Sequence, residues 1–151
     1  CQNDKVVVDV VNSMGGQAVT IHWHGLHMRK TPWMDGVPYL TQCPIPFSSS
    51  FRYQFPVKDF GTMWYHTHTG MHKVNGLHGG FVIRQPRENN LNAEYYDYDL
   101  REHLIVISDW MKVAVEQFSP GLTNTRLQPS NLLINGKGTV MVVSFAVKLS
   151  V

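Results

Sequence analysis

The sequence predicts an all-β fold, a sandwich or barrel built from short strands. Short β-branched or alternating segments recur along the 151 residues, and turn signals separate them at intervals of about 8–12 residues. No segment carries a helical apolar stripe longer than about three turns. Hydrophobic residues make up 43% and charged residues 16% of the chain, which is ordinary for a globular protein.

The first part of the chain contains the clearest strands. Residues 5–11 (KVVVDVV) are β-branched, and residues 51–55 (FRYQF) alternate aromatic and polar side chains, as a half-buried strand does. Residues 25–46 are rich in glycine and proline without periodicity, which predicts a long functional loop. The expected strands of this part are residues 5–11, 18–24, 51–55, 62–68 and 79–84.

A change of composition divides the chain. Residues 87–101 are polar and rich in tyrosine and aspartate, and we expect them to form a linker between domains. A β pattern restarts at residues 103–108, and residues 140–147 are a further expected strand. The predicted organisation is therefore a first domain over 1–86 and a partial second domain over 102–151, which is too short to form a stable sandwich alone.

Charge, hydropathy and cysteine content narrow the classes of partner. The formal net charge of +2 is too small and too scattered to predict binding to nucleic acid or to an anionic membrane. The longest apolar stretch, residues 141–147, is far too short to span a bilayer.

Cys1 and Cys43 are the only cysteines, and they are able to pair with each other, to bind metal or to pair with cysteines outside this sequence. A cysteine at residue 1 leads us to expect that the chain has been trimmed.

Two histidine motifs point to a metal site: His-Trp-His at residues 22–24 and His-Thr-His at residues 66–68. Each places two imidazoles at positions i and i+2, which on a strand lie on one face with Cα atoms roughly 6.5 Å apart. At that distance they reach two neighbouring metal ions more easily than they chelate one. Imidazole nitrogens suit copper, zinc, iron or nickel rather than magnesium or calcium. One such pair is more often a surface decoration, but two pairs in similar surroundings favour a cluster of several ions.

The remaining histidines and the flanking aromatic residues have simpler expected roles. We expect His27 to be an exposed loop residue. The other histidines, His72, His78 and His103, are expected to be structural or surface residues. The aromatic residues near the motifs, namely Trp23, Trp33, Trp64 and Tyr65, are expected to pack in the core.

Three segments resemble the first cupredoxin domain of multicopper oxidases: residues 22–45 (HWHGLHMRKTPWMDGVPYLTQCPI), 61–70 (GTMWYHTHTG) and 79–86 (GGFVIRQP). Residues 103–111 and 132–138 resemble the opening of the second cupredoxin domain. The laccase-like and ferroxidase-like branches fit best, and invertebrate-type laccases are the most similar. The resemblance implies a secreted protein with a cupredoxin-like Greek-key β-sandwich or barrel, whose first strand is missing here, followed by the beginning of a second such domain.

The resemblance also implies a ligand set. In this family four His-x-His motifs bind a trinuclear copper cluster that reduces O2 to water. By position in the motifs, His22 resembles the type 2 copper ligand, His24 and His66 resemble ligands that share one type 3 copper, and His68 resembles a ligand of the other type 3 copper. Asp35 resembles a carboxylate beside the cluster that tunes it and assists proton delivery. The alternative for Asp35 is a plain turn residue.

The family's other two histidine motifs, including the His-Cys-His segment that binds type 1 copper, do not occur in this sequence. We therefore expect the chain to supply half of the ligands of the trinuclear site, to be inactive by itself and to depend on the remaining domains of a parent protein. Cys43 resembles a cysteine that in this family often forms a disulfide to the third domain. Cys1 resembles a cysteine of invertebrate laccases that also pairs outside this region.

The leading hypothesis is a portion of a laccase-like multicopper oxidase that oxidises phenolic or aromatic substrates by one-electron steps and passes the electrons to O2. A metal-ion reductant, as in a ferroxidase, is an alternative. A second hypothesis is a non-catalytic copper-binding or structural protein derived from such an enzyme. A third is a zinc-binding β module, which would hold one tetrahedral ion per chain.

Overall fold

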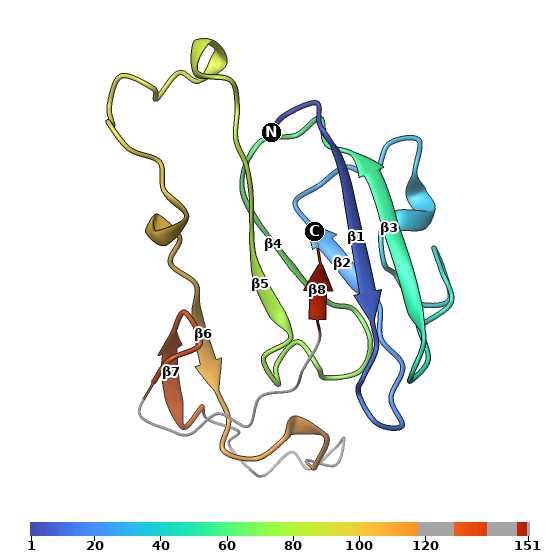
Figure 1. Cartoon of the computed structure of the whole chain (residues 1–151). Helices are drawn as coiled ribbons and strands as arrows, with labels where there is room; N and C mark the ends of the chain where they lie inside the picture. Colours follow the sequence, from blue (N-terminus) through green and yellow to red (C-terminus); the bar gives the residue numbers. More distant parts are fainter. Residues whose placement is uncertain (118–128, 139–147, 151) are drawn as a thin grey trace.

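The computed structural model describes residues 1–117, 129–138 and 148–150 (Figure 1). It confirms the all-β prediction, because the described ranges contain strands and short 3₁₀ helices but no α-helix. The strands are β1 (Lys5–Val11), β2 (Ile21–His24), β3 (Ser50–Pro56), β4 (Gly61–Thr67), β5 (His78–Ile83), β6 (Ile107–Trp110), β7 (Asn131–Ile134) and β8 (Lys148–Ser150). The 3₁₀ helices are η1 (Pro32–Met34), η2 (Arg87–Asn89), η3 (Arg101–His103) and η4 (Val115–Gln117). None of the helices in these ranges is long and apolar enough to cross a bilayer.

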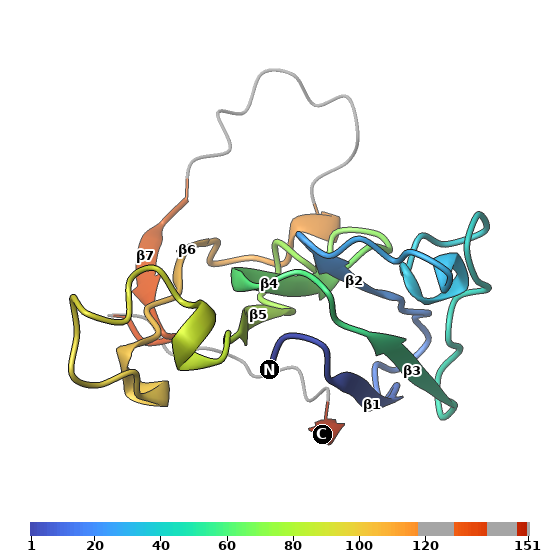
Figure 2. The same cartoon turned by 90° about the horizontal axis from the view of Figure 1, so that it is seen from above.

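The described strands form two three-stranded sheets and one separate two-stranded sheet. The first sheet has the order β3-β1-β8 and the second has the order β2-β4-β5, while β6 and β7 pair only with each other. All neighbouring strands are antiparallel. Seen from above, the two sheets lie as two layers (Figure 2). Buried residues from both sheets belong to one hydrophobic core, so the first part of the chain is a β-sandwich.

The observed strands of the first part follow the predicted ones closely, while β7 and β8 were not predicted and two other expected strands begin later than predicted. Residues 18–24 were expected to be one strand, but β2 begins only at Ile21, because Val19 pairs with Ile45 as an isolated bridge. The strand expected at 103–108 begins only at Ile107, because η3 occupies residues 101–103. The other expected strands before residue 87 match within one residue at each end. The strand expected at 140–147 lies outside the described residues.

Trp23 lies at the centre of the core. Its side chain is only 1% exposed and it projects from β2 between the two sheets. Its ring centroid lies between 5.2 and 6.1 Å from four other aromatic rings, those of Tyr53, Phe55, Tyr65 and Phe81. Because side chains alternate along a strand, burial of Trp23 directs its two neighbours in sequence to the opposite face of the sheet. Those neighbours are His22 and His24.

The Tyr53 hydroxyl joins three segments inside the core. This fully buried residue of β3 accepts a hydrogen bond from the Ile21 backbone N–H at 2.9 Å and donates one to Gln42 Oε1 at 2.7 Å. Burial raises the pKa of Tyr53 to about 12, although both hydrogen bonds act in the opposite direction. The phenol therefore stays neutral at physiological pH and holds the start of β2 against the loop that precedes β3.

We expect Tyr53→Phe to lower the free energy of unfolding by about 1–3 kcal/mol, because it leaves the buried Ile21 N–H without its partner. Urea denaturation followed by tryptophan fluorescence measures this change. Tyr39→Phe is the matched control, because Tyr39 is 88% exposed and its loss of a hydroxyl should leave stability unchanged. Equal stability of Tyr53→Phe and the parent protein would contradict the role assigned to this hydroxyl.

Candidate metal centre

Strands β2 and β4 bring the two histidine motifs side by side. The strands are antiparallel, and their register places His22 directly opposite His66 and His24 directly opposite Trp64. Ile21 and Trp23 are buried in the core, so His22 and His24 lie on the outer face of the sheet. The i and i+2 spacing thus places each pair on one face, and strand pairing places the two motifs next to each other.

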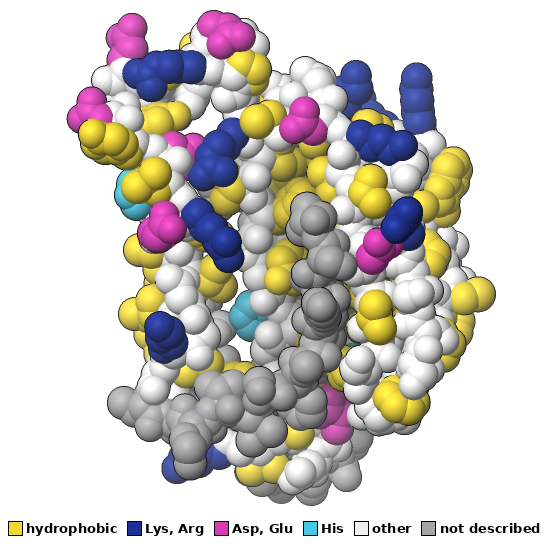
Figure 3. All heavy atoms as spheres, viewed as in Figure 1, with side chains coloured by type: hydrophobic (Ala, Val, Ile, Leu, Met, Phe, Trp, Pro, Cys, Tyr) yellow, Lys and Arg dark blue, Asp and Glu magenta, His cyan; other side chains and the backbone are white. Residues whose placement is uncertain are grey.

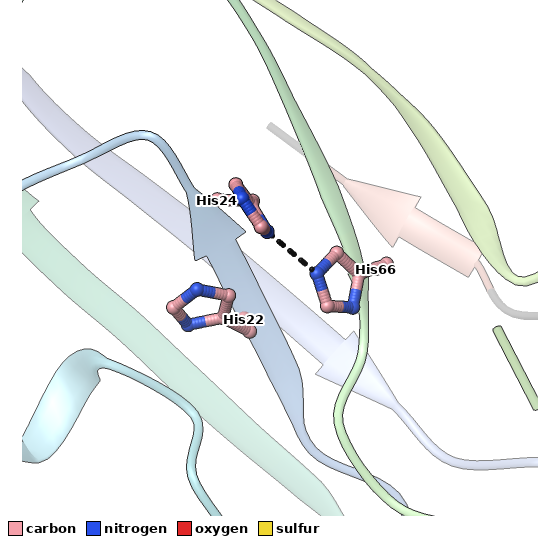
Figure 4. Close-up of side chains that lie close together, drawn as sticks. All are labelled: His22, His24 and His66. Carbon is pink, nitrogen blue, oxygen red and sulfur yellow. Dashed lines mark hydrogen bonds between the residues drawn. The ribbon is translucent and has the colours of Figure 1, made fainter.

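Three of the four motif histidines form a compact group. One ring nitrogen from each of His22, His24 and His66 lies within 4.8 Å of the other two. The closest pair is His24 Nδ1 and His66 Nε2, at 3.1 Å, and Figure 4 shows these two atoms facing each other. Two nitrogens that bind one ion at about 2.0–2.1 Å with a tetrahedral angle are separated by roughly 3.3 Å. The observed separation therefore fits two ligands of a single metal ion.

Backbone carbonyls fix the orientation of two of these rings. His22 Nδ1 donates to the carbonyl oxygen of Asp35 at 2.7 Å, and His66 Nδ1 donates to the carbonyl oxygen of Thr67 at 2.8 Å. A carbonyl can only accept, so Nδ1 carries the proton in both rings and Nε2 keeps its lone pair. His24 Nδ1 is then the donor in its hydrogen bond with His66 Nε2. Such carbonyl partners are a common device for orienting metal-binding histidines.

His68 and Asp35 lie beside this group. His68 directly follows β4 and is exposed, and its ring centroid is 5.4 Å from that of His22 and 6.0 Å from that of His66. Asp35 follows η1, and its carboxylate Oδ1 is 3.4 Å from His22 Nδ1, in addition to the contact through its carbonyl. Asp35 therefore fits both interpretations. Its carboxylate lies next to a candidate ligand, and its backbone forms a turn.

Trp64 covers one side of the group. Its ring lies 5.0 Å from the His24 ring in a stacked arrangement and 4.3 Å from the His66 ring, and Lys73 Nζ is 5.9 Å from its centroid. The prediction of core packing is correct for Trp23 and wrong for Trp64, which is 36% exposed, and for Trp33, which is 54% exposed. Trp64 lies two residues before His66, so the same alternation that places His66 outside also places Trp64 there.

The other histidines lie outside this group. His27 is exposed, and its ring and backbone N–H both contact the Asp59 carboxylate, at 3.0 and 2.8 Å. His78 pairs with His66 in the sheet register, but its Nδ1 contacts the Lys73 carbonyl at 3.1 Å. His72 is buried, with Nδ1 3.4 Å from the Glu116 carboxylate. His103 is part of η3.

Burial lowers the pKa of the His66 imidazole below its usual value of 6.5. The hydrogen bond to Thr67 opposes this shift, while the positive charges of Lys73, His22 and His24 add to it. The neutral ring is therefore favoured, and the neutral ring is the form that binds metal.

This shift predicts the sign of a pH effect on stability. In metal-free protein the unfolded state binds a proton at His66 more readily than the folded state does. The free energy of unfolding should therefore fall as the pH is lowered from about 6.5 through the lowered folded-state pKa. Urea denaturation with a chelator at several values between about pH 5 and pH 7.5 measures this slope. In His66→Gln the slope should become shallower, and an unchanged slope would show that other groups cause it.

Comparison with known proteins identifies relatives of this chain. A sequence model of the family described as "Multicopper oxidase" matches residues 1–88. The chain is 37% identical to the L-ascorbate oxidase of Cucumis sativus over 139 residues, which cover 89% of this chain and 23% of that protein. It is 40% identical to Laccase-1 of Fomitopsis schrenkii over 120 residues, which cover 79% of this chain and 21% of that protein.

Solved structures lead to the same family. The crystal structure of Fet3p, a multicopper oxidase that functions in iron import, is similar with a TM-score of 0.74 at 33% identity, over 89% of this chain and 26% of that chain. The chain spans about a quarter of the length of the curated relatives it matches. The particular similarity to invertebrate-type laccases stays a prediction. Because the family model matches more than half of the sequence and the fold agrees, this chain belongs to the multicopper oxidase family.

Proposed function

We propose that this chain forms the oxygen-reducing end of a laccase-like multicopper oxidase and supplies half of the ligands of its trinuclear copper cluster. In this assignment His22 binds the type 2 copper, His24 and His66 share one type 3 copper, and His68 binds the other. The observation that carries the proposal is the 3.1 Å separation of His24 Nδ1 and His66 Nε2, with a ring nitrogen of His22 close to both. The other ligands and the type 1 copper would come from further domains of the same protein.

The donor set fits copper. The three grouped rings offer nitrogen atoms only, and carbonyl oxygens hold two of them with the proton on Nδ1 and the lone pair on Nε2. When bound, the cluster would supply the four-electron reduction of O2 to water. His22, His24, His66 and His68 would hold the metal ions, and Trp64 would exclude water from the side on which its ring stacks. The Asp35 carboxylate would lie beside His22, 3.4 Å from its Nδ1.

The domain boundaries belong to the same proposal. We assign residues 1–86 to the first cupredoxin-like domain, 87–101 to a linker and 102–151 to part of a second domain. The family model ends at residue 88, and among the described strands β6 and β7 form a two-stranded sheet of their own, while β8, at residues 148–150, joins the first sheet beside β1. The wider protein would act outside the cell, as the laccase resemblance implies.

The reductant is proposed to be a phenol or another aromatic compound that gives up single electrons. A ferroxidase activity is the second candidate, because the similar structure of Fet3p belongs to a protein that functions in iron import. The two activities are compared by measuring O2 consumption of the full-length protein with a phenolic dye precursor and with Fe(II). Faster turnover of the phenol is expected, and turnover of Fe(II) alone would select the second candidate.

Elemental analysis with electron paramagnetic resonance (EPR) of the full-length protein tests the copper assignment. We expect more than one copper ion per chain, with a type 2 signal and a silent coupled pair. A single tetrahedral zinc ion per chain would overturn the proposal in favour of a zinc module. Bound copper without turnover of either reductant would select a non-catalytic copper protein.

Asp35→Asn separates the two interpretations of Asp35, because asparagine keeps the turn and the carbonyl contact to His22 but removes the charge. We expect turnover to fall by about 10–100-fold with copper content unchanged, which is the usual cost of removing a group that supports metal ligands. Steady-state O2 consumption measures the change, and Asp59→Asn is the control, because Asp59 contacts the exposed His27 instead. Normal turnover of Asp35→Asn would identify Asp35 as a turn residue only.

A further inference from the structure

The segment between β5 and β6 has an unusual composition. Residues 94–99 (EYYDYD), here called the tyrosine segment, contain three tyrosines and three acidic residues and form neither strand nor helix. Tyr95 is 84% exposed and Tyr98 is 73% exposed. In Figure 1 the chain from η2 to η3 runs outside the two sheets, and Figure 3 shows acidic and basic side chains interspersed over this region.

Both ends of the tyrosine segment are fixed to the rest of the molecule. Ala93, immediately before it, is buried, and its carbonyl accepts a hydrogen bond from Arg87 Nη2 at 3.0 Å. At the other end the Asp99 carboxylate forms two hydrogen bonds with Arg84, at 2.7 and 2.9 Å. Tyr95 and Tyr98 are therefore exposed on a surface loop whose two ends are held in place.

Tyr96 differs from its two neighbours. It is half-buried, and its hydroxyl accepts a hydrogen bond from Asn90 Nδ2 at 2.6 Å. Its phenol oxygen is therefore already engaged inside the loop, whereas the phenols of Tyr95 and Tyr98 point to solvent. Each of the three tyrosines has an acidic neighbour in sequence, because Glu94 precedes Tyr95 and Asp97 lies between Tyr96 and Tyr98, so it is the engaged hydroxyl and the lower exposure that set Tyr96 apart.

We propose that Tyr95 and Tyr98 are sites of tyrosine O-sulfation and that Tyr96 is not. The sulfate donor is a nucleotide-activated sulfate with several negative charges, so a transferase that binds it has a cationic active site and favours acidic residues next to the target. The phenol oxygen forms a bond to sulfur, the sulfur–oxygen bond to the nucleotide phosphate breaks, and the phenol proton goes to a base of the transferase. No electrons are exchanged. The inference rests on the extracellular location in the proposed function.

The test is mass spectrometry of the full-length protein secreted from animal cells, with peptides that cover the tyrosine segment. We expect sulfate on Tyr95, on Tyr98 or on both, resistant to phosphatase and lost when the cells grow in chlorate, which blocks formation of activated sulfate. Absence of sulfate from both residues, sulfate on Tyr96 instead, or phosphate in its place would overturn the proposal.

Two variants test which residues of the tyrosine segment direct the sulfation. Asp97→Asn should lower the sulfate on Tyr98 several-fold and leave Tyr95 unchanged, while Tyr96→Phe should change neither. Asp97 lies on the surface, and Tyr96→Phe removes only a hydroxyl group, so both variants should fold. The yield of secreted protein checks this. Mass spectrometry of the tyrosine segment does not depend on copper, so the two proposals can fail separately. A secreted protein that carries sulfate but binds no copper would contradict the proposed function and support this inference. A copper enzyme without sulfate would support the proposed function and contradict this inference.

Discussion

Gly36→Ala is expected to lower the free energy of unfolding by about 3 kcal/mol or more, among the largest effects of any single substitution in this chain. A Cβ atom on Gly36 would lie 1.8 Å from the Ile21 carbonyl oxygen and 2.9 Å from the His22 backbone nitrogen. Both are backbone atoms of β2 and cannot rotate away. Gly36 also has a φ of +78°, which strains any residue with a side chain.

The same substitution should weaken the metal site. The turn that contains Gly36 also presents the Asp35 carbonyl to His22 Nδ1, so moving the turn away from β2 removes the contact that orients this ring. Urea denaturation and the type 2 copper EPR signal of the full-length protein measure the two effects. Gly15→Ala is the matched control, because a Cβ atom there would meet nothing within 4 Å. Parent-like stability of Gly36→Ala would contradict the close packing of this turn on β2.

His66→Ala is expected to lower O2 consumption by more than about 100-fold, above the usual cost of losing a group that only supports a ligand. His24→Ala should have a similar effect. Because the two nitrogens face each other at 3.1 Å and are proposed to bind the same ion, the double variant should be little worse than either single variant.

His78→Ala is the control for this pair, because it lies directly across from His66 in the neighbouring strand but contacts the Lys73 carbonyl. Its copper content and turnover should remain close to those of the parent protein. Fully additive losses in the His24 and His66 variants would show that the two residues act on separate ions.

The local arrangement of the candidate site could be predicted from the sequence, because strand alternation depends only on neighbouring residues. The i and i+2 spacing places His22 and His24 on the same face of the sheet. Trp64 lies two residues before His66, so the same alternation would also have placed Trp64 outside the core. The register of β2 with β4 could not be obtained in this way, since it depends on contacts between residues 40 or more positions apart. The assignment of His24 and His66 to one ion came from the family resemblance alone.

Other features required the three-dimensional structure. Nothing in the sequence around Tyr53 indicates that its hydroxyl lies between Ile21 and Gln42. The contact of Gly36 with β2 joins a long loop to a strand, and Gly36 before Val37-Pro38 looks like an ordinary turn. Just before β6, the Val106 carbonyl accepts a hydrogen bond from the Asn135 backbone and the Val106 N–H donates one to the Asn135 side chain, a contact between residues far apart in the chain.

The carbonyl contacts of His22 and His66 have a consequence for the way in which the site takes up metal. Both rings already present an unprotonated Nε2, so neither needs to lose or move a proton when an ion arrives. Only His24 holds a proton on the nitrogen that faces the group. Because His66 Nε2 accepts the hydrogen bond from His24, we expect loading to begin at His22 and to reach His66 and His24 only when the His24 proton moves from Nδ1 to Nε2. The rate of metal uptake would then depend on that one imidazole.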